Sequence, residues 1–168
     1  MPPTLESPRL ILRPHRPDDF PASATLWADP IVTRHIGGRP LSEEEAWTKF
    51  LRYFGHWTCL GFGYWVVEER SSGAFVGEVG FADYKRNLES SAKGLPEMGW
   101  VLSPAFHGKG YATEAVSTAL DWANGRFPRV SCIIHPENTA STRVAQKCGF
   151  VELERTLYNG RETIVFTR

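Results

Sequence analysis

The chain has 168 residues, of which 42% are apolar and 23% are charged, and its 19 basic side chains balance its 19 acidic ones. This length and composition predict one soluble globular domain over residues 1–168 with a single hydrophobic core. A net charge of zero without a basic stripe argues against a nucleic-acid-binding protein, because such proteins neutralise phosphates with clustered Lys and Arg.

The cysteines and the N-terminus indicate the compartment. Cys59, Cys132 and Cys148 have no CxxC spacing, and an odd number of cysteines argues against a disulfide framework. The stretch MPPTLESPRL lacks the apolar core of a signal peptide, and no apolar run reaches the length of a membrane span. We therefore expect a cytoplasmic protein without membrane contact. The five histidines show no ligand spacing, so no metal site is expected.

The first third of the chain predicts one strand and two helices. Residues 10–14 alternate as a short strand, and Asp18 is placed to cap a helix that runs to about Ala28, before Pro30. Ser42 and Glu45 have the spacing of a capping box and open a second helix. The face of this second helix that we expect to be buried consists of Ala46, Trp47, Phe50, Leu51 and Phe54.

The middle of the chain changes to the pattern of strands. Residues 63–69 and 75–84 read as two strands joined by the turn 70–73. The polar segment 87–96 reads as a loop, and 97–102 reads as a short apolar strand.

The last third predicts two helices and three strands. A helix is expected over 112–123, with a buried stripe of Ala112, Val116, Ala119, Leu120 and Ala123. A strand follows at 130–134, and Asn138 can cap a helix that ends at Lys147, with Gly149 as a left-handed exit. The strands 150–157 and 162–166 flank Asn159-Gly160, the strongest short hairpin signal.

This order of elements predicts an α+β domain. A single helix crosses between the fourth and fifth strands, so those two strands can be parallel, whereas hairpins make the others antiparallel. We expect a mixed, mostly antiparallel sheet of about seven strands with helices on both faces.

The segment SPAFHGKGYATEAV, residues 103–116, places two glycines directly before a helix. The first turn of a helix has free N–H groups and a partial positive charge, and glycine lets the backbone approach an anion closely. GxxxxGK[ST] is absent, and Thr113 stands where a dinucleotide fingerprint needs its third glycine. Taken alone, the segment also fits a tight turn with no ligand.

A second segment, HPENTASTRVAQKCGF at 135–150, follows the next strand. Asn138 and Ser141 lie one helical turn apart, facing the gap between the two parallel strands. A capped amphipathic helix without a functional role also explains most of this string.

With these two segments, the chain resembles the GNAT superfamily of N-acetyltransferases, and within it the RimJ/RimL-type branch, which acetylates N-terminal amines and related small amines. The similarity begins with ESPRLILRP at 6–14 and includes FVGEVGF at 75–81. It is most specific in MGWVLSPAFHGKGYATEA at 98–115 and NTASTRVAQKCGF at 138–150, and GFVELER and the closing hairpin complete it.

The resemblance implies acetyl-CoA as donor, with no metal. Its pyrophosphate would lie on the loop 108–112, its pantetheine arm would extend along the strand 97–102, and the fourth and fifth strands would splay to admit it. The cofactor-binding residues so implied are Trp100, Val101, Leu102, His107, Gly108, Lys109, Gly110, Tyr111, Ala112, Thr113, Asn138 and Ser141.

Two positions depart from the family pattern. The superfamily often has Gln or Arg at the position of His107, which matters little if main-chain groups bind the phosphates. Many members also carry a tyrosine that protonates the departing thiolate, and here that position is Ala145. The RimJ/RimL-type branch commonly lacks this tyrosine, and Ser141 is the substitute we expect.

Acetyl transfer needs a neutral amine, so a general base is a further candidate. Glu78 and Glu97, both in strand runs, are the candidate bases, acting directly or through water. A main-chain N–H on the fourth strand could hold the developing oxyanion. Trp57, Tyr64 and Trp65 are candidates to line an acceptor pocket, although core packing also explains them.

The acceptor is expected to be a protein N-terminal α-amine or a small-molecule amine, and the protein a monomer or homodimer. A non-catalytic acyl-CoA-binding module and an antibiotic or polyamine acetyltransferase stay open as alternatives. An acidic acceptor groove would favour the latter, but the only acidic run, Glu43-Glu44-Glu45, is explained by the capping box.

Overall fold

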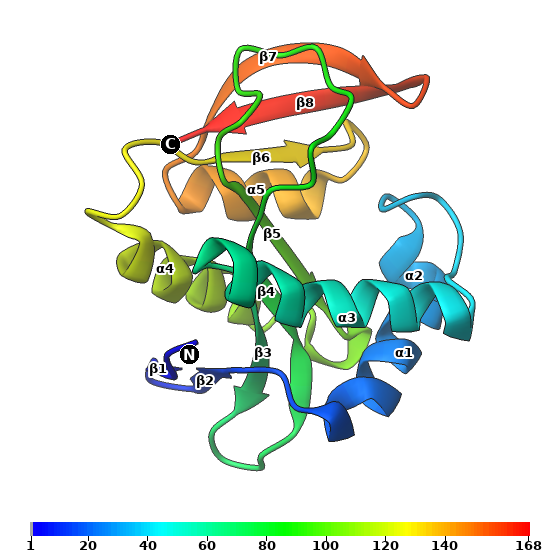
Figure 1. The fold of residues 1–168 in the computed structure, drawn as a ribbon, viewed down its shortest axis with the longest axis vertical. Coiled ribbons are helices and arrows are strands. Elements are labelled where there is room, and N and C mark those ends of the chain that lie inside the picture. The colour runs from blue at the N-terminus through cyan, green and yellow to red at the C-terminus, as the bar shows by residue number, and fades with distance from the viewer. Residues whose placement is uncertain (1) are drawn as a thin grey trace.

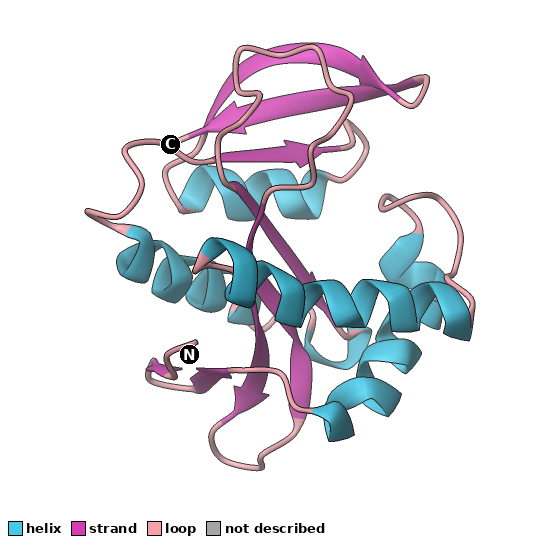
Figure 2. Cartoon of the chain, viewed as in Figure 1, coloured by secondary structure: helices cyan, strands magenta, loops and turns pink. Residues whose placement is uncertain are grey.

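The computed structural model describes residues 2–168, which form eight strands and five α-helices (Figures 1 and 2). The strands are β1 (Leu5–Glu6), β2 (Leu10–Arg13), β3 (Tyr64–Glu69), β4 (Phe75–Ala82), β5 (Glu97–Leu102), β6 (Ser131–Ile134), β7 (Val151–Tyr158) and β8 (Arg161–Thr167). The helices are α1 (Phe20–Ala28), α2 (Pro30–Thr33), α3 (Glu43–Leu60), α4 (Tyr111–Ala123) and α5 (Thr139–Lys147), and short 3-10 helices lie at Pro17–Asp19 and Pro104–Phe106.

All eight strands belong to one sheet in the order β1-β2-β3-β4-β5-β6-β8-β7. The pair β5–β6 is parallel, and every other neighbouring pair is antiparallel. The expected α+β fold with a mixed, mostly antiparallel sheet is therefore confirmed. The strand beyond the seven expected is β1, which pairs over only two residues.

The sheet buries both of its faces because successive side chains of a strand point to opposite sides. Trp65, Val79 and Phe81 share one face and belong to the core that includes α4. Tyr64 and Ala82 lie on the opposite face, packed against Phe50 and Tyr53 of α3. Helices thus cover both faces of the sheet, as expected from the order of elements in the sequence.

The two parallel strands part almost at once. Their ladder consists of Glu97 opposite Ser131, where the N–H of Ser131 donates to the carbonyl of Pro96 at 3.0 Å. Beyond this bridge β5 and β6 run in different directions (Figure 1). The expected splay of the central parallel pair is therefore confirmed.

One expected boundary of the N-terminal helix is wrong, and the other is confirmed. Asp18 lies inside a 3-10 turn and does not cap the helix; the N-cap is Asp19, whose carboxylate accepts from Arg13 and from the Arg16 N–H. The helix ends at Ala28, as expected, and Pro30 then opens the short helix α2, because proline has no N–H to lose in a first turn.

Helix α3 begins at the predicted capping box. The Ser42 hydroxyl accepts from the Glu45 N–H at 3.2 Å, and the Glu45 carboxylate accepts from the Ser42 N–H at 2.8 Å. Its buried face is narrower than predicted, because Trp47 and Leu51 remain 44% and 49% exposed. The buried residues are Ala46, Phe50 and Tyr53, a stripe with the spacing of one helix face.

No helix within residues 2–168 is both long enough and apolar enough to cross a membrane.

Candidate functional site

The loop before α4 contains two glycines with a left-handed backbone. Gly108 and Gly110 have φ angles of 75° and 79°, and Gly110 is the N-cap of α4. Side chains with a Cβ are strained at such angles, so glycine suits both positions. The loop thus turns sharply from the end of β5 into the helix.

The main-chain N–H groups of this loop are free to bind an anion. From Gly108 to Thr113, no main-chain N–H finds an acceptor within residues 2–168. Consecutive N–H groups at a helix N-terminus form a concave site for phosphate, reinforced by the helix dipole. The predicted residues Gly108, Lys109, Gly110, Tyr111, Ala112 and Thr113 therefore lie in one arrangement suited to a pyrophosphate.

Side chains from elsewhere hold this loop in place. Arg9, between β1 and β2, donates to the carbonyl of Lys109 at 2.8 Å and pairs with Glu114 of α4 at 2.7 Å. The ring of His107 donates to the carbonyl of Leu102 at 2.9 Å. His107 thus braces the loop against the end of β5. Sequence spacing does not point to Arg9, because Arg9 lies about 100 residues before the loop that it holds.

A cavity of about 570 Å³ opens where β5 and β6 part. Of the predicted site residues, Glu97, Trp100, Val101, Asn138 and Ser141 line it. Leu102 is buried and the glycine loop lies outside the lining. The volume suits a small ligand.

The first turn of α5 presents one free hydroxyl to the cavity. The side-chain oxygen of Asn138 accepts from the N–H of Ser141 at 3.1 Å, which confirms Asn138 as the N-cap. The Ser141 hydroxyl has no partner within residues 2–168. Ala145 is fully buried in the core and is not among the residues that line the cavity.

Glu97 lies in the cavity wall but is already paired. Arg86 donates to both of its carboxylate oxygens at 2.7 Å. The same guanidinium donates to the Tyr158 hydroxyl at 3.1 Å and lies 4.6 Å from the centre of the Tyr84 ring. With both oxygens occupied by a charged donor, Glu97 is poorly placed to take a proton from an amine.

Glu78 lies outside the cavity, fully buried between α1, α3 and the sheet. It accepts from Ser23 at 2.6 Å, Trp27 at 2.9 Å and Tyr53 at 2.5 Å, and the ring of His15 lies at 3.4 Å. Burial by itself would raise the pKa of Glu78, but the His15 ring, first, and then the hydroxyls of Ser23 and Tyr53 outweigh burial and keep the pKa below its ordinary value. Such a saturated carboxylate suits a structural role.

Of the three aromatic residues considered for an acceptor pocket, Tyr64 lines the cavity. Trp65 is fully buried and packs edge-on against Trp57 and Trp122. Core packing therefore accounts for Trp57 and Trp65.

Cationic side chains that the sequence analysis did not select also line the cavity. They are Lys49 and Arg52 of α3, Arg86 after β4, and Arg161 at the start of β8. These residues come from distant parts of the chain, so no local motif could bring them together.

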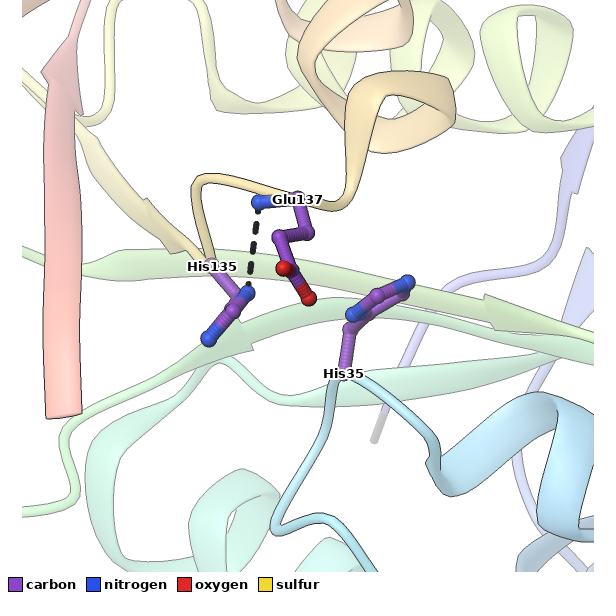
Figure 3. Close-up of side chains that lie close together, drawn as sticks. All are labelled: His35, His135 and Glu137. Carbon is purple, nitrogen blue, oxygen red and sulfur yellow. Dashed lines mark hydrogen bonds between the residues drawn. The ribbon is translucent and has the colours of Figure 1, made fainter.

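Two histidines and a glutamate lie together beside the cavity (Figure 3). The ligand atoms of His35, His135 and Glu137 lie within 4.8 Å of one another, and both histidines line the cavity. The His135 Nδ1 accepts from the Glu137 N–H at 3.2 Å, which places the ring proton on Nε2. While this hydrogen bond lasts, a neutral His135 ring therefore has no free lone pair for a metal. The pKa of His35 is lowered, first by burial and then by the nearby Arg34.

Comparisons with known proteins agree on one family. The family model described as "Acetyltransferase (GNAT) domain" matches residues 9–151. The Bacillus subtilis protein YkkB is 32% identical over 127 residues, which cover 74% of this chain and 70% of that protein. The N-acetyltransferase p20 of Bacillus licheniformis is 25% identical over 150 residues, which cover 88% of this chain and 82% of that protein.

Solved structures share the fold. A GnaT-family acetyltransferase from Bordetella pertussis superposes with a TM-score of 0.87 at 25% identity, covering 99% of both chains. RimL, a ribosomal L7/L12 α-N-protein acetyltransferase solved with coenzyme A, superposes with a TM-score of 0.77 at 16% identity, over 99% of this chain and 97% of RimL. Spermidine N-acetyltransferase from Vibrio cholerae gives 0.74 at 20% identity, over 96% of both chains. The last two likenesses show the fold alone.

Proposed function

Because the chain belongs to the GNAT acetyltransferase family, we propose that it transfers the acetyl group of acetyl-CoA to a primary amine by direct attack, with both substrates bound. We further propose that it belongs to the RimJ/RimL-type branch, with a protein N-terminal α-amine or a small-molecule amine as acceptor. The parting of β5 and β6 after the single bridge Glu97–Ser131 is the observation that carries the proposal. It opens a cavity whose wall includes Ser141.

The glycine loop fits the phosphates of acetyl-CoA. The free N–H groups from Gly108 to Thr113 would hold the pyrophosphate, and main-chain donors tolerate the change of side chain at His107. Acetyl-CoA supplies the acetyl group as a thioester.

The edge of β5 fits an extended pantetheine arm. The N–H of Ser103 donates toward β4, so Trp100 directs its main-chain groups to the opposite side, toward β6. Because the β5–β6 ladder stops at Glu97, the Trp100 groups have no strand partner within residues 2–168. They are free to bind an amide chain as an added strand would, and the Trp100 N–H is free to polarise a carbonyl.

The remaining task is to move protons. An α-amine titrates near ~8, so a useful fraction is neutral without a dedicated base. Glu97 is held by Arg86 and Glu78 is remote, so water in the open cavity is the proton acceptor that we favour. The Ser141 hydroxyl is free to donate a hydrogen bond to the departing sulfur.

Thermal unfolding with added ligands tests the donor. Acetyl-CoA and CoA should raise the Tm, because a ligand at 100 times its Kd stabilises the native state by about 2.7 kcal/mol. NAD and ATP at equal concentration should raise it much less. Intact-mass analysis of amines and peptide N-termini incubated with acetyl-CoA then tests transfer. Equal Tm shifts from all ligands, or CoA binding without transfer to any amine, would contradict the proposed function.

A further inference from the structure

The cavity beside β5 and β6 has a strong excess of positive charge. Four cationic side chains line it, namely Lys49, Arg52, Arg86 and Arg161, against the single carboxylate of Glu97. Arg86 and Glu97 neutralise each other. Within residues 2–168, no carboxylate lies within 4.0 Å of the charged groups of the other three.

These three cations are held by non-acidic neighbours. The Lys49 ammonium lies 4.0 Å from the centre of the Trp27 ring, and the Arg52 guanidinium lies 5.7 Å from the centre of the Tyr84 ring. The Arg161 guanidinium lies beside Gly38, in the loop after α2. Aromatic faces thus lie against Lys49 and Arg52 without neutralising their charges, and Arg161 has no acidic partner within residues 2–168.

The pKa values of two groups in the cavity wall are lowered, mainly by burial. Burial lowers the pKa of Lys49 to about 8, with Glu78 and Glu97 opposing the shift and Arg52 and Arg86 adding to it, so this ammonium is still mostly charged at pH 7. Burial and the nearby Arg34, His135 and Arg161 lower the pKa of His35.

The phosphates of CoA do not account for these cations. The glycine loop has its own free N–H donors and contributes no residue to the cavity wall. A cationic pocket beside a reaction cleft attracts anions and repels polycations, and charges in such a recess are screened less than exposed charges.

We infer that the acceptor is a primary amine that also carries a carboxylate or phosphate group, bound by Lys49, Arg52 and Arg161. This inference rests on the proposed function and narrows its acceptor. A small amino acid and the acidic N-terminus of a peptide both present this chemistry. Polyamines and aminoglycosides, which carry several positive charges, do not.

Matched acceptors test the inference. The α-amides of glutamate, glutamine and arginine share an α-amine and lack the α-carboxylate, so they differ in side-chain charge alone, and phosphoethanolamine and ethanolamine form a second set. Peptides beginning Ser-Glu-Glu, Ser-Gln-Gln or Ser-Lys-Lys separate a peptide source from a small-molecule source. We would measure kcat/KM for CoA release, and the affinity of each acceptor for the CoA-bound protein by calorimetry.

Charge variants connect the preference to the cavity. Lys49→Met and Arg161→Gln should each lower kcat/KM for the best anionic acceptor by roughly 10- to 100-fold, the range for one charge-assisted hydrogen bond. The neutral member of the same set should change much less. Arg126→Gln, an exposed arginine outside the cavity wall, is the matched control. Circular dichroism and the Tm shift with CoA verify that each variant is folded.

The results distinguish the inference from the function on which it rests. At least a tenfold preference for the anionic member, reduced by Lys49→Met or Arg161→Gln, supports the inference. Equal or better use of neutral or cationic amines overturns it and leaves the acetyltransferase function intact. If no amine accepts an acetyl group, the proposed function fails, and the calorimetric comparison alone decides whether the cavity selects anions.

Discussion

Arg9 and Glu114 join the N-terminal hairpin to the first turn of α4, with Arg9 Nε donating to Glu114 Oε2 at 2.7 Å. The same guanidinium donates to the carbonyl of Lys109 and lies 4.5 Å from the centre of the Tyr111 ring. One side chain therefore holds the glycine loop on both sides of Gly110. Through this contact, the N-terminal hairpin helps to shape the expected phosphate site.

Arg9→Ala should weaken CoA binding although Arg9 is outside the predicted contact set. Without the hydrogen bond from Arg9 to the Lys109 carbonyl, the glycine loop is less ordered in the free protein. CoA binding must then order the loop, and this entropy cost weakens the affinity. We expect the Kd of CoA to rise roughly 3- to 30-fold, with a small change in Tm. Arg155→Ala, which removes an exposed ion pair on β7, is the control and should leave the Kd unchanged. An unaltered Kd in Arg9→Ala would show that the loop holds its shape without this contact.

Gly110→Val should reduce CoA affinity at least tenfold while the protein still folds. A branched side chain is strained at a φ of 79° and places carbon atoms among the free N–H groups. Gly125→Val separates the two effects, because Gly125 has a φ of 75°, open space around a Cβ, and a place outside the loop. Calorimetry should find normal CoA binding in Gly125→Val. Parent-like binding in Gly110→Val would make the loop a structural turn.

Local signals explain which parts of the site could be predicted. The glycines before α4 predict a loop whose backbone can approach an anion closely, and the left-handed φ angles of Gly108 and Gly110 are consistent with such a loop. Asn138 caps α5 through a hydrogen bond three residues away, which sequence spacing encodes directly. The expectation that β5 and β6 splay apart rests on the family resemblance, because no single residue encodes this splay.

The surroundings of the cavity could not be predicted in this way. Lys49, Arg86 and Arg161 meet only because α3, the segment after β4 and the start of β8 line one cavity. His35 meets His135 only through the loop after α2. Alternation places Glu78 on one face of β4 but does not show that four side chains fill that space.

Glu78→Gln should destabilise the fold without removing activity from the folded molecules. In the parent protein the donors around residue 78 bond to a carboxylate. In the variant the amide places its N–H₂ group against some of these donors, and this mismatch costs about 2–4 kcal/mol of stability. Urea unfolding measures this loss, and Glu152→Gln, on an exposed ion pair, should scarcely change. A large fall in kcat with normal stability would restore Glu78 as a catalytic base.

The same carboxylate predicts acid sensitivity. His15 and the hydrogen bonds to Glu78 keep its pKa in the native state below its ordinary value. The contribution of Glu78 to the free energy of unfolding is therefore fully present above about pH 4.3, and it is lost as the pH falls through the lower native pKa. The free-energy difference between the parent and Glu78→Gln should therefore shrink in acid. A constant difference between pH 7 and pH 3 would contradict this assignment.

Lys49 predicts how the acceptor preference depends on pH. Its pKa is lowered to about 8, first by burial and further by Arg52 and Arg86, against the opposing carboxylates of Glu78 and Glu97. As the pH rises through 8 the ammonium loses its charge, so the preference for an anionic over a matched neutral acceptor should fall. Taking the ratio of the two kcat/KM values cancels the titration of the acceptor amine when the two amines match. In Lys49→Met the ratio should be low and nearly independent of pH between 7 and 9.

Ser141→Ala should lower kcat by roughly 10- to 1000-fold, the range for one lost acid or charge-stabilising donor. Ala145 cannot donate a proton and faces the core, whereas the Ser141 hydroxyl lines the cavity with no other partner within residues 2–168. A thiol near pKa ~8.5 leaves without full protonation at neutral pH, so a hydrogen bond to sulfur is sufficient help. The Kd of acetyl-CoA should change little, because the Asn138 cap uses the Ser141 main chain and survives the substitution. Thr139→Ala, an exposed hydroxyl in the same turn, is the control. An unchanged kcat with a raised KM for acetyl-CoA would make Ser141 a binding residue and leave water, Tyr84 or Tyr158 as the proton source.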